Sequence, residues 1–265
     1  MKNKLYNENC LNTMQRMPGG LIDLTVTSPP YDNLREYKGF SFPFEQVATE
    51  VFRVTKNGGV LVWVVGDQTV NGSESGTSFK QALFFMQCGF KLHDTMIYQK
   101  ANYMPLNHNR YDPEFEYMFV FSKGKPNTFN PLLIPCKTAG ASYNYATRSS
   151  ASSKEKNGAL RTRDEVKITN THKFRGNIWS YDTGKHKGSK DNIWAHPATF
   201  PEKLALDHIL SWSNKGDTIY DPFAGSGTTL KMANLNERHW IGSEISEEYC
   251  KIAELRLCDT MLLGF

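Results

Sequence analysis

The chain has 265 residues, of which 39% are hydrophobic and 22% charged, and its formal net charge is +4. This length suffices for one sizeable core but is short for two independent domains, so we expect one domain that carries an insertion. The five cysteines form no C-x-x-C pair, which disfavours a disulfide framework and a zinc site. Neither a signal peptide nor a membrane-spanning apolar run is present, so we expect a cytoplasmic protein with neither a metal nor a membrane partner.

Apolar runs of strand length alternate with segments of helical period, a pattern typical of a layered α/β sheet. In chain order it predicts a strand at 21–27, a helix at 44–55, a strand at 60–65, a helix at 78–87 and a strand at 117–121. Further along, it predicts a helix at 201–212, a strand at 218–220, a helix at 228–237 and a strand at 240–243. Ser78 is expected to cap the second helix. The almost continuous apolar character of the strands indicates helices on both faces of the sheet.

The pattern fails between residues 137 and 192, where Ser, Thr, Asn, Gly and Lys are frequent. This stretch holds twelve Lys or Arg and five Asp or Glu, a net charge of +7 that leaves −3 for the rest of the chain. A segment of this charge can neutralise phosphates, and its composition is equally typical of a solvated loop. We therefore predict a loop-rich insertion at 137–191 between two parts of one domain, 1–136 and 192–265.

The sequence DPFAGSGTT at 221–229 directly follows a predicted strand and directly precedes a predicted helix. Open α/β sheets bind ligands at such turns. No Lys follows the second glycine, and Leu230 stands where a dinucleotide-binding sequence has its third glycine, so a pyrophosphate ligand is disfavoured. S-adenosylmethionine fits better, because Asp221 and Glu244 can bind its amino group and its ribose. A tight strand-to-helix connection without a ligand is the alternative.

The sequence Ser28-Pro29-Pro30-Tyr31 closes the first strong strand. The two prolines fix the backbone and lack N–H donors, so carbonyl groups and the Ser28 hydroxyl are left to accept hydrogen bonds. Such acceptors suit an amino group, whose nitrogen they would draw toward a tetrahedral shape for direct attack on a sulfonium methyl. Tyr31 offers a face on which a flipped base can stack. The alternative is a rigid turn that only ends a strand.

Together these two motifs resemble those of the amino-methyltransferases of DNA, in which a (D/N/S)-P-P-(Y/F/W) motif and a D-P-F-x-G-S-G-T-T motif occur together. Their order along the chain is similar to that of the permuted β group. The resemblance extends to residues 107–121, 192–194 and 196–201, and covers roughly residues 5–123 and 192–258. It implies a Rossmann-like sheet of the S-adenosylmethionine-dependent methyltransferases, with circularly permuted motifs and an inserted recognition region.

The resemblance also implies roles for individual residues. The target base would be held by Ser28, Pro29, Pro30 and Tyr31. S-adenosylmethionine would be held by Asn9, His196, Pro197, Asp221, Pro222, Phe223, Ala224, Gly225, Gly227, Thr228 and Glu244. Among these, Asn9 would lie near the adenine, and His196 and Pro197 near the methionine end. Target recognition would fall to residues 137–191, and DNA would be contacted by Arg110, Arg148, Arg161, Arg163, Lys173 and Arg175.

The resemblance leaves two target atoms open, cytosine N4 and adenine N6. Members that methylate cytosine N4 usually begin the catalytic motif with Ser and adenine members with Asp, so Ser28 favours cytosine N4. The sequence HPATFP at 196–201 points the same way. A C5-cytosine enzyme would need a cysteine nucleophile in its catalytic motif, and Pro135-Cys136 lies far from that motif.

Two further classes of function are weighed against this one. An inactive DNA-binding subunit would be expected to have lost part of the catalytic motif, which is intact. An RNA methyltransferase is disfavoured by the permuted motif order and the basic insertion. We expect double-stranded DNA as the partner, and leave a cognate restriction endonuclease and a homodimer open.

Overall fold

The computed structural model describes residues 1–30, 42–103, 109–137, 142–143, 166–167, 171–182 and 201–262. The chain divides into two compact units. The larger unit comprises Met1–Asn130 and Asn177–Phe265, and the smaller one comprises Pro131–Gly176. No helix within the described ranges has the length and apolar character needed to cross a membrane.

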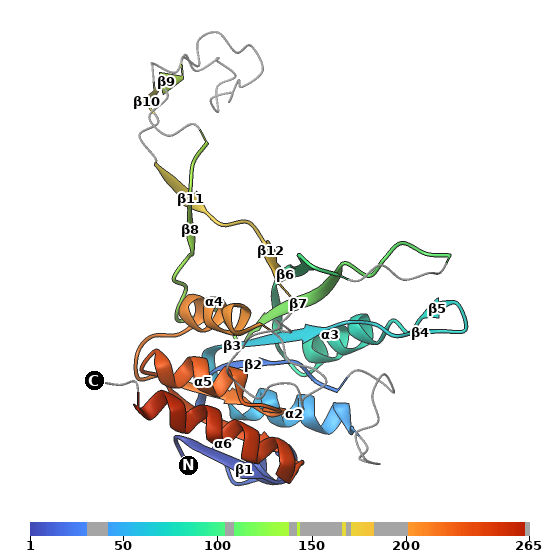
Figure 1. The fold of residues 1–265 in the computed structure, drawn as a ribbon, viewed down its shortest axis with the longest axis vertical. Helices are drawn as coiled ribbons and strands as arrows, with labels where there is room; N and C mark the ends of the chain where they lie inside the picture. The colour runs from blue at the N-terminus through green and yellow to red at the C-terminus, as the bar shows by residue number, and fades with distance from the viewer. Residues whose placement is uncertain are drawn as a thin grey trace, which may run out of the picture. The chain divides into compact units, whose positions relative to one another are not determined.

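A mixed sheet of eight strands forms the centre of the larger unit (Figure 1). Its order is β1 (Lys4–Asn7), β14 (His239–Glu244), β13 (Thr218–Asp221), β2 (Ile22–Thr27), β3 (Thr55–Val65), β7 (Phe115–Ser122), β6 (Lys91–Lys100) and β12 (Ile178–Tyr181). Strand β7 is antiparallel to β3 and β6, and the other neighbouring pairs of this sheet are parallel. The predicted strands correspond to β2, β3, β7, β13 and β14, and the predicted fold class is confirmed.

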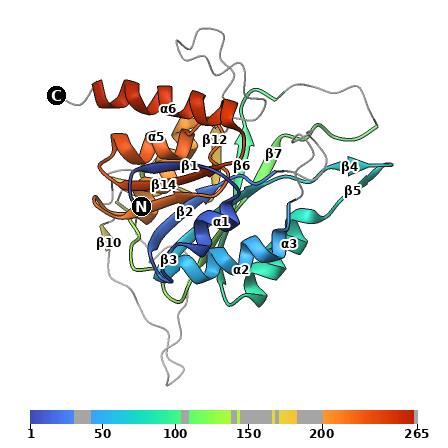
Figure 2. The same cartoon turned by 90° about the horizontal axis from the view of Figure 1, so that it is seen from below.

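Helices cover both faces of this sheet, as the apolar strands indicated. On one face lie α1 (Cys10–Gln15), α2 (Phe44–Val54) and α3 (Thr77–Gln87), and on the other lie α4 (Glu202–Trp212), α5 (Thr228–Leu235) and α6 (Glu247–Leu262). Figure 2 shows the strands between α5 and α6 on one side and α1, α2 and α3 on the other. Helices α2, α3, α4 and α5 correspond to the four predicted helices.

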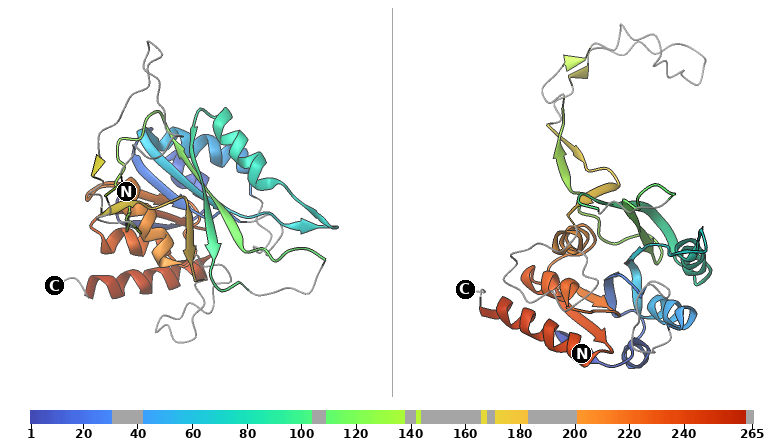
Figure 3. Two further views of the ribbon diagram at one scale, coloured as in Figure 1. Left: turned by 90° about the horizontal axis from the view of Figure 1, so that it is seen from above. Right: turned by 45° about the vertical axis from the view of Figure 1, so that its right-hand side comes forward.

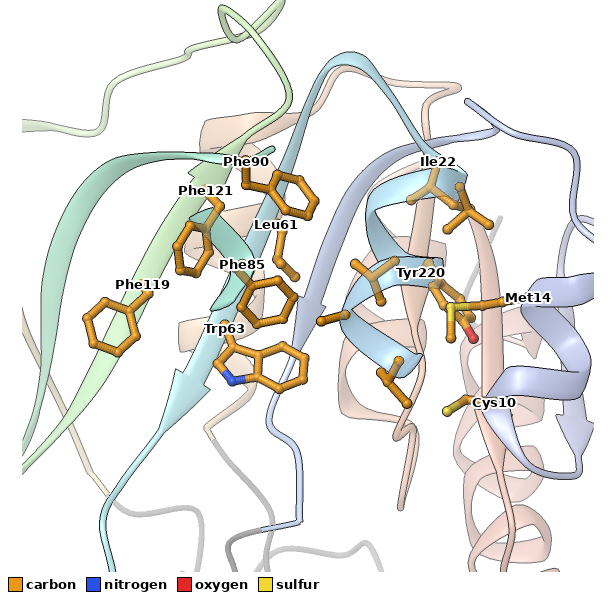
Figure 4. Packing of buried hydrophobic residues seen from close by; sticks show 14 of the residues in the cluster. Cys10, Met14, Ile22, Leu61, Trp63, Phe85, Phe90, Phe119, Phe121 and Tyr220 are labelled. Atoms are coloured by element: carbon orange, nitrogen blue, oxygen red, sulfur yellow. The ribbon is translucent and has the colours of Figure 1, made fainter. Parts of the chain in front are cut away.

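Successive side chains of β3 point to opposite faces of the sheet, and both sets are part of the hydrophobic core. Leu61, Trp63 and Val65 belong to the hydrophobic cluster beneath α1, α2 and α3, in which Trp63 and Phe85 lie with their ring centroids 4.9 Å apart (Figure 4). The intervening residues of β3, among them Val62, are as fully buried on the opposite face. Burial of both sets of side chains stabilises the three layers together, because each removes apolar surface from water.

The path of the chain creates a switch point between two neighbouring parallel strands. Helix α2 leads from β2 to β3 on one face of the sheet, whereas α5 leads from β13 to β14 on the other. Because β2 and β13 are adjacent and parallel, the two crossovers leave their carboxyl ends toward opposite faces of the sheet, and open α/β sheets bind ligands at such a point. Both motifs begin at these strand ends.

Smaller pairings complete the fold. A hairpin of β4 (Thr69–Val70) and β5 (Ser73–Glu74) extends beyond the end of β3 (Figure 3). In the smaller unit, β8 (Leu133–Pro135) pairs with β11 (His172–Phe174), and β9 (Ser142–Tyr143) pairs with β10 (Val166–Lys167). These pairings are antiparallel two-stranded ribbons.

The predicted helix cap at Ser78 is wrong. Helix α3 begins at Thr77, and Ser78 is a buried residue of its first turn. The acceptor for this end of the helix is Asp67, whose Oδ1 takes a hydrogen bond from the Ser78 backbone N–H at 2.9 Å and whose Oδ2 takes one from the Ser78 hydroxyl. A carboxylate here also suits the positive end of the helix dipole.

Candidate active site

Asp221 ends β13 and is almost fully buried, with 1% of its surface exposed. Its Oδ1 accepts hydrogen bonds from Thr27 Oγ1 at 2.6 Å and from the Phe223 backbone N–H at 3.0 Å. Burial raises the pKa of Asp221 to about 6, and the nearby Glu244 contributes in the same direction, against the hydrogen bonds that lower it. Thr27 directly precedes Ser28, so this buried contact joins the Ser-Pro-Pro motif to the glycine-containing motif.

Glu244 ends the next strand, β14, and presents a second partly buried carboxylate at the same edge of the sheet. Its Oε2 accepts a hydrogen bond from the Gly225 N–H and its Oε1 one from the Ser246 N–H, both at 2.8 Å. Burial raises the pKa of Glu244, although these backbone bonds oppose the rise. Two neighbouring carboxylates whose ionised forms are penalised by burial favour a cationic ligand.

The turn between Asp221 and α5 brings its backbone against these acids. Gly225 and Gly227 both have positive φ, 50° and 77°, a conformation that glycine adopts without the cost paid by other residues. The Ala224 N–H donates to the Ser243 carbonyl at 2.9 Å and the Gly227 N–H to the Ala224 carbonyl at 2.7 Å. Within the turn, Pro222, Ala224 and Thr228 are buried and Phe223 is partly exposed.

Ser28, Pro29 and Pro30 follow β2 directly and lie beside the turn through the Thr27–Asp221 contact. Pro29 is buried, and Ser28 and Pro30 are partly exposed. Phe223, in the glycine-containing turn, belongs to a group of aromatic side chains. Its ring packs edge-on against Phe42, with 5.3 Å between the ring centroids, and against Trp63, with 6.2 Å. No motif or periodicity along the chain had pointed to Phe42.

Asn9 follows β1, the strand beside β14. Its side-chain oxygen caps α1 by accepting the Leu11 N–H at 2.9 Å. The next residue, Cys10, is buried, and burial raises the pKa of its thiol to about 12, with a smaller contribution from the charges of Glu244 and Asp221. Asn9 thus lies at the same sheet edge as the two acids, with a structural role that the sequence did not predict.

A profile of the family N6_N4_Mtase, described as DNA methylase, matches residues 22–255. The orphan methyltransferase M.BamHII of Bacillus amyloliquefaciens is 54% identical to the chain over 243 residues, which are 91% of each protein. The chain belongs to the N6_N4_Mtase family of DNA methylases. It is a DNA methyltransferase of the N4-cytosine or N6-adenine type, and the matched range contains both motifs.

Solved structures agree with this methylase fold. TTHA0409, a putative DNA modification methylase from Thermus thermophilus, covers 99% of the methylase and 96% of its own chain with a TM-score of 0.65 and 26% identity. The PvuII DNA methyltransferase, which is cytosine-N4-specific, covers 97% of the methylase and 86% of its own chain with a TM-score of 0.70 and 19% identity. At 19% identity the second likeness establishes the fold alone.

Several predicted site residues of the methylase lie outside the described residues, namely Tyr31, Arg148, Arg161, Arg163, His196 and Pro197. Of the described cations, Arg110 donates to the Gly72 carbonyl and lies 3.8 Å from the Glu74 carboxylate, so it contacts the β4–β5 hairpin. Lys173 is exposed on β11, and Arg175 directly follows that strand. The structure thus brings together Ser28, Pro29, Pro30, Asp221 and Glu244 at one sheet edge, and places Lys173 and Arg175 in the smaller unit.

Proposed function

We propose that this methylase transfers a methyl group from S-adenosylmethionine to the exocyclic N4 of cytosine in double-stranded DNA. The observation that carries the proposal is the buried contact between Thr27 and Asp221, which sets the Ser-Pro-Pro motif beside the glycine-containing motif at the switch point of the sheet. A base held by the first motif and a ligand held by the second would therefore meet at one place.

The residues at this edge fit S-adenosylmethionine. The ligand is cationic at its sulfonium and at its amino group, which suits the raised pKa values of Asp221 and Glu244. Each oxygen of Glu244 already accepts one backbone N–H, and its remaining lone pairs suit the two hydroxyls of a ribose. We assign further contacts to Asn9, His196 and Pro197, and to the turn residues Pro222, Phe223, Ala224, Gly225, Gly227 and Thr228.

S-adenosylmethionine supplies a methyl group bound to a positively charged sulfur. For the acceptor, the carbonyl groups and hydroxyl of Ser28, Pro29 and Pro30 would take the two N–H hydrogens of the base amino group. This hydrogen bonding shifts the nitrogen lone pair away from the ring, so that the nitrogen can form the new N–C bond while the S–C bond breaks. One amino proton would then pass to the accepting oxygens of this motif and on to solvent, and Tyr31 would stack on the flipped base.

Cytosine N4 is proposed over adenine N6 because the catalytic motif begins with Ser28. Serine at this position is usual in the cytosine-N4 members that the sequence resembles, and aspartate is usual in the adenine members. The segment 196–201, HPATFP, supports the same branch. Since both amino groups are bound through the same two hydrogens, the rest of the site suits either base.

The smaller unit is proposed to contact the DNA. It overlaps the recognition region that we predict at 137–191 over residues 137–176. Its described residues include four Lys or Arg and no Asp or Glu. The β8–β11 ribbon exposes Lys173 together with the apolar side chains of Leu133 and Phe174, and a two-stranded ribbon is narrow enough to enter a major groove. Phosphate contacts are assigned to Lys173, Arg175, Arg110, Arg148, Arg161 and Arg163.

The test is to incubate the purified methylase with methyl-labelled S-adenosylmethionine and mixed-sequence duplex DNA, then digest the DNA and identify the labelled nucleoside by mass spectrometry. We expect N4-methylcytosine. Labelled N6-methyladenine would overturn the choice of base and retain the cofactor and the site. Absence of label from every nucleoside, with M.BamHII as a positive control, would overturn the proposed reaction.

A further inference from the structure

The guanidinium of Arg256 is buried against the glycine-containing turn, with 5% of the side chain exposed. Its Nη1 lies 2.6 Å from the Ser226 carbonyl oxygen, 3.0 Å from Ser226 Oγ and 3.2 Å from Thr228 Oγ1. Arg256 belongs to α6, which contributes no residue to either motif. An arginine remote in sequence therefore holds both the backbone and the side chains of the turn.

The other terminal nitrogen of Arg256 binds a carboxylate that three helices share. Nη2 donates to Glu202 Oε1 at 2.7 Å, and Lys231 Nζ donates to the same oxygen at 2.9 Å. Glu202 is the first residue of α4, and Lys231 lies in the first turn of α5. The network ties α4, α5 and α6 together at the point where the turn enters α5.

Two polar groups of the turn are held from opposite sides. The Gly225 N–H points to Glu244, whereas the Ser226 carbonyl points to Arg256. Helix α6 also packs closely here, since a Cβ added at Gly227 would lie 2.8 Å from the Cβ of Ala253, one turn before Arg256. The arginine and the alanine thus hold the turn from the side of α6 while Glu244 holds it from the sheet.

Stability alone does not explain a buried guanidinium in this position. A buried ion pair contributes little net stability compared with an apolar replacement, because both charges must leave water. A peptide between two glycines of positive φ, however, can rotate into other conformations at low cost. A charge-assisted hydrogen bond to the Ser226 carbonyl would suppress those rotations before any ligand binds.

We propose that Arg256 is a positioning residue of the cofactor site, which fixes residues 225–228 in the conformation that binds S-adenosylmethionine. The identity of the ligand rests on the proposed function. Without Arg256, only a fraction of the molecules would hold the turn in this conformation. The apparent dissociation constant for S-adenosylmethionine would then equal the intrinsic constant divided by that fraction. The effect falls on binding, because Arg256 touches the turn and not the catalytic motif.

The experiment measures S-adenosylmethionine binding by calorimetry for the wild type, Arg256→Met, Arg256→Lys and Lys251→Met. We expect Arg256→Met to weaken binding by about tenfold to a hundredfold. Arg256→Lys keeps the charge but not the forked donors, so a smaller loss of about threefold to tenfold is expected. Lys251→Met removes an exposed cation paired with Glu247 on the same helix and should leave binding unchanged.

Two further readouts separate positioning from a general loss of folding. The KM for S-adenosylmethionine should rise in Arg256→Met while kcat at saturating ligand stays near the wild-type value. The thermal shift that the ligand causes, taken relative to each variant's own unliganded midpoint, should fall in the same order as the affinity.

A dissociation constant within twofold of the wild type in folded Arg256→Met would overturn the inference. Should that variant not fold, the same result in Arg256→Lys would overturn it. If the wild type itself bound no S-adenosylmethionine, the proposed cofactor would be wrong. That outcome is distinct from unchanged binding in the variants.

Discussion

Thr27 Oγ1 donates a hydrogen bond to Asp221 Oδ1 across 2.6 Å, and the two residues end adjacent parallel strands. Neither side chain is accessible, so the contact orients the two strand ends relative to one another. Because one strand continues into Ser-Pro-Pro and the other into the glycine-containing turn, this hydrogen bond sets the spacing between the two functional motifs.

Replacing Thr27 with Val removes this hydrogen bond and keeps the branched shape of the side chain. We expect the free energy of unfolding to fall by about 1–3 kcal/mol, because the buried carboxylate loses a donor. The pKa of Asp221 should rise further, since Thr27 lowers it. The kcat/KM for DNA should fall by about tenfold as the motifs lose their register. Urea unfolding and steady-state kinetics measure these effects.

The matched control lies two residues earlier on the same strand. Thr25 is also fully buried, and its Oγ1 has no hydrogen-bond partner among the described residues. Thr25→Val should therefore be neutral or slightly stabilising, because it removes an unsatisfied hydroxyl. Equal loss of stability and activity in both variants would show that the Thr27 hydroxyl has no special role.

Replacing Asp221 with Asn should separate stability from binding. The pKa of Asp221 is raised to about 6, so the folded protein binds a proton between pH 4 and 6 that the unfolded chain releases. Stability is therefore lost as pH rises through this interval, by about 3 kcal/mol at most, and the loss persists at neutral pH. Asn carries no charge, so Asp221→Asn should be more stable than the wild type at pH 7.5. Its free energy of unfolding should also change less between pH 4 and 6 than that of the wild type.

Affinity for S-adenosylmethionine should change in the opposite direction. A cationic ligand prefers ionised Asp221, so wild-type binding should weaken as pH falls from 7 to 5, and Asp221→Asn should bind weakly at both values. Asp217→Asn, directly before the first residue of the same strand, serves as the control. Calorimetry at pH 5 and pH 7, with urea unfolding at pH 4.5 and 7.5, tests both halves. A variant that binds as tightly as the wild type would exclude a role for this charge.

The sequence was sufficient to predict the elements that carry strong apolar patterns, and it pointed to Asp221, Glu244 and Ser28, which the structure places at one edge of the sheet. It did not predict β1, whose four residues, Lys4–Asn7, include few apolar side chains and pair only with β14 within the described sheet. Strand β6 was missed because polar side chains interrupt its apolar pattern. Edge and half-exposed strands are defined by their neighbours more than by their own residues.

Contacts between distant residues account for the rest of what the sequence could not show. Thr27 and Asp221 are 194 positions apart, and Arg256 meets Glu202 across 54. Asp67 caps α3 from eleven residues away, whereas the local pattern pointed to Ser78. Each contact requires the assembled sheet, because no periodicity or spacing in the sequence specifies which strand ends or helices become neighbours.

Gly242→Ala tests how closely α5 and its turn must approach β14. A Cβ at this position would lie 2.5 Å from Leu230 Cδ1, 2.9 Å from Leu5 Cδ1 and 3.3 Å from Ala224 Cβ. We expect a loss of about 1–3 kcal/mol in the free energy of unfolding, because a packed core must shift to admit the methyl group. Gly19→Ala, where the nearest atom is 3.5 Å away, should be neutral or slightly stabilising. Equal midpoints in urea for both variants would show that the core adapts freely.

Replacing Lys173 or Arg175 with Ala tests the β8–β11 ribbon as a DNA-binding element. Each variant should weaken binding to a duplex similarly for all sequences and should reduce the slope of log K against log salt by about one, because one phosphate contact is lost. Lys215→Ala is the control. Lys215 is an exposed cation that precedes the amino end of β13, whereas the two motifs follow carboxyl ends of strands, and it pairs with Glu237. Fluorescence anisotropy across a salt series measures the slopes. Slopes equal to that of Lys215→Ala would place the DNA away from this ribbon, and a loss confined to one sequence would instead indicate a base contact.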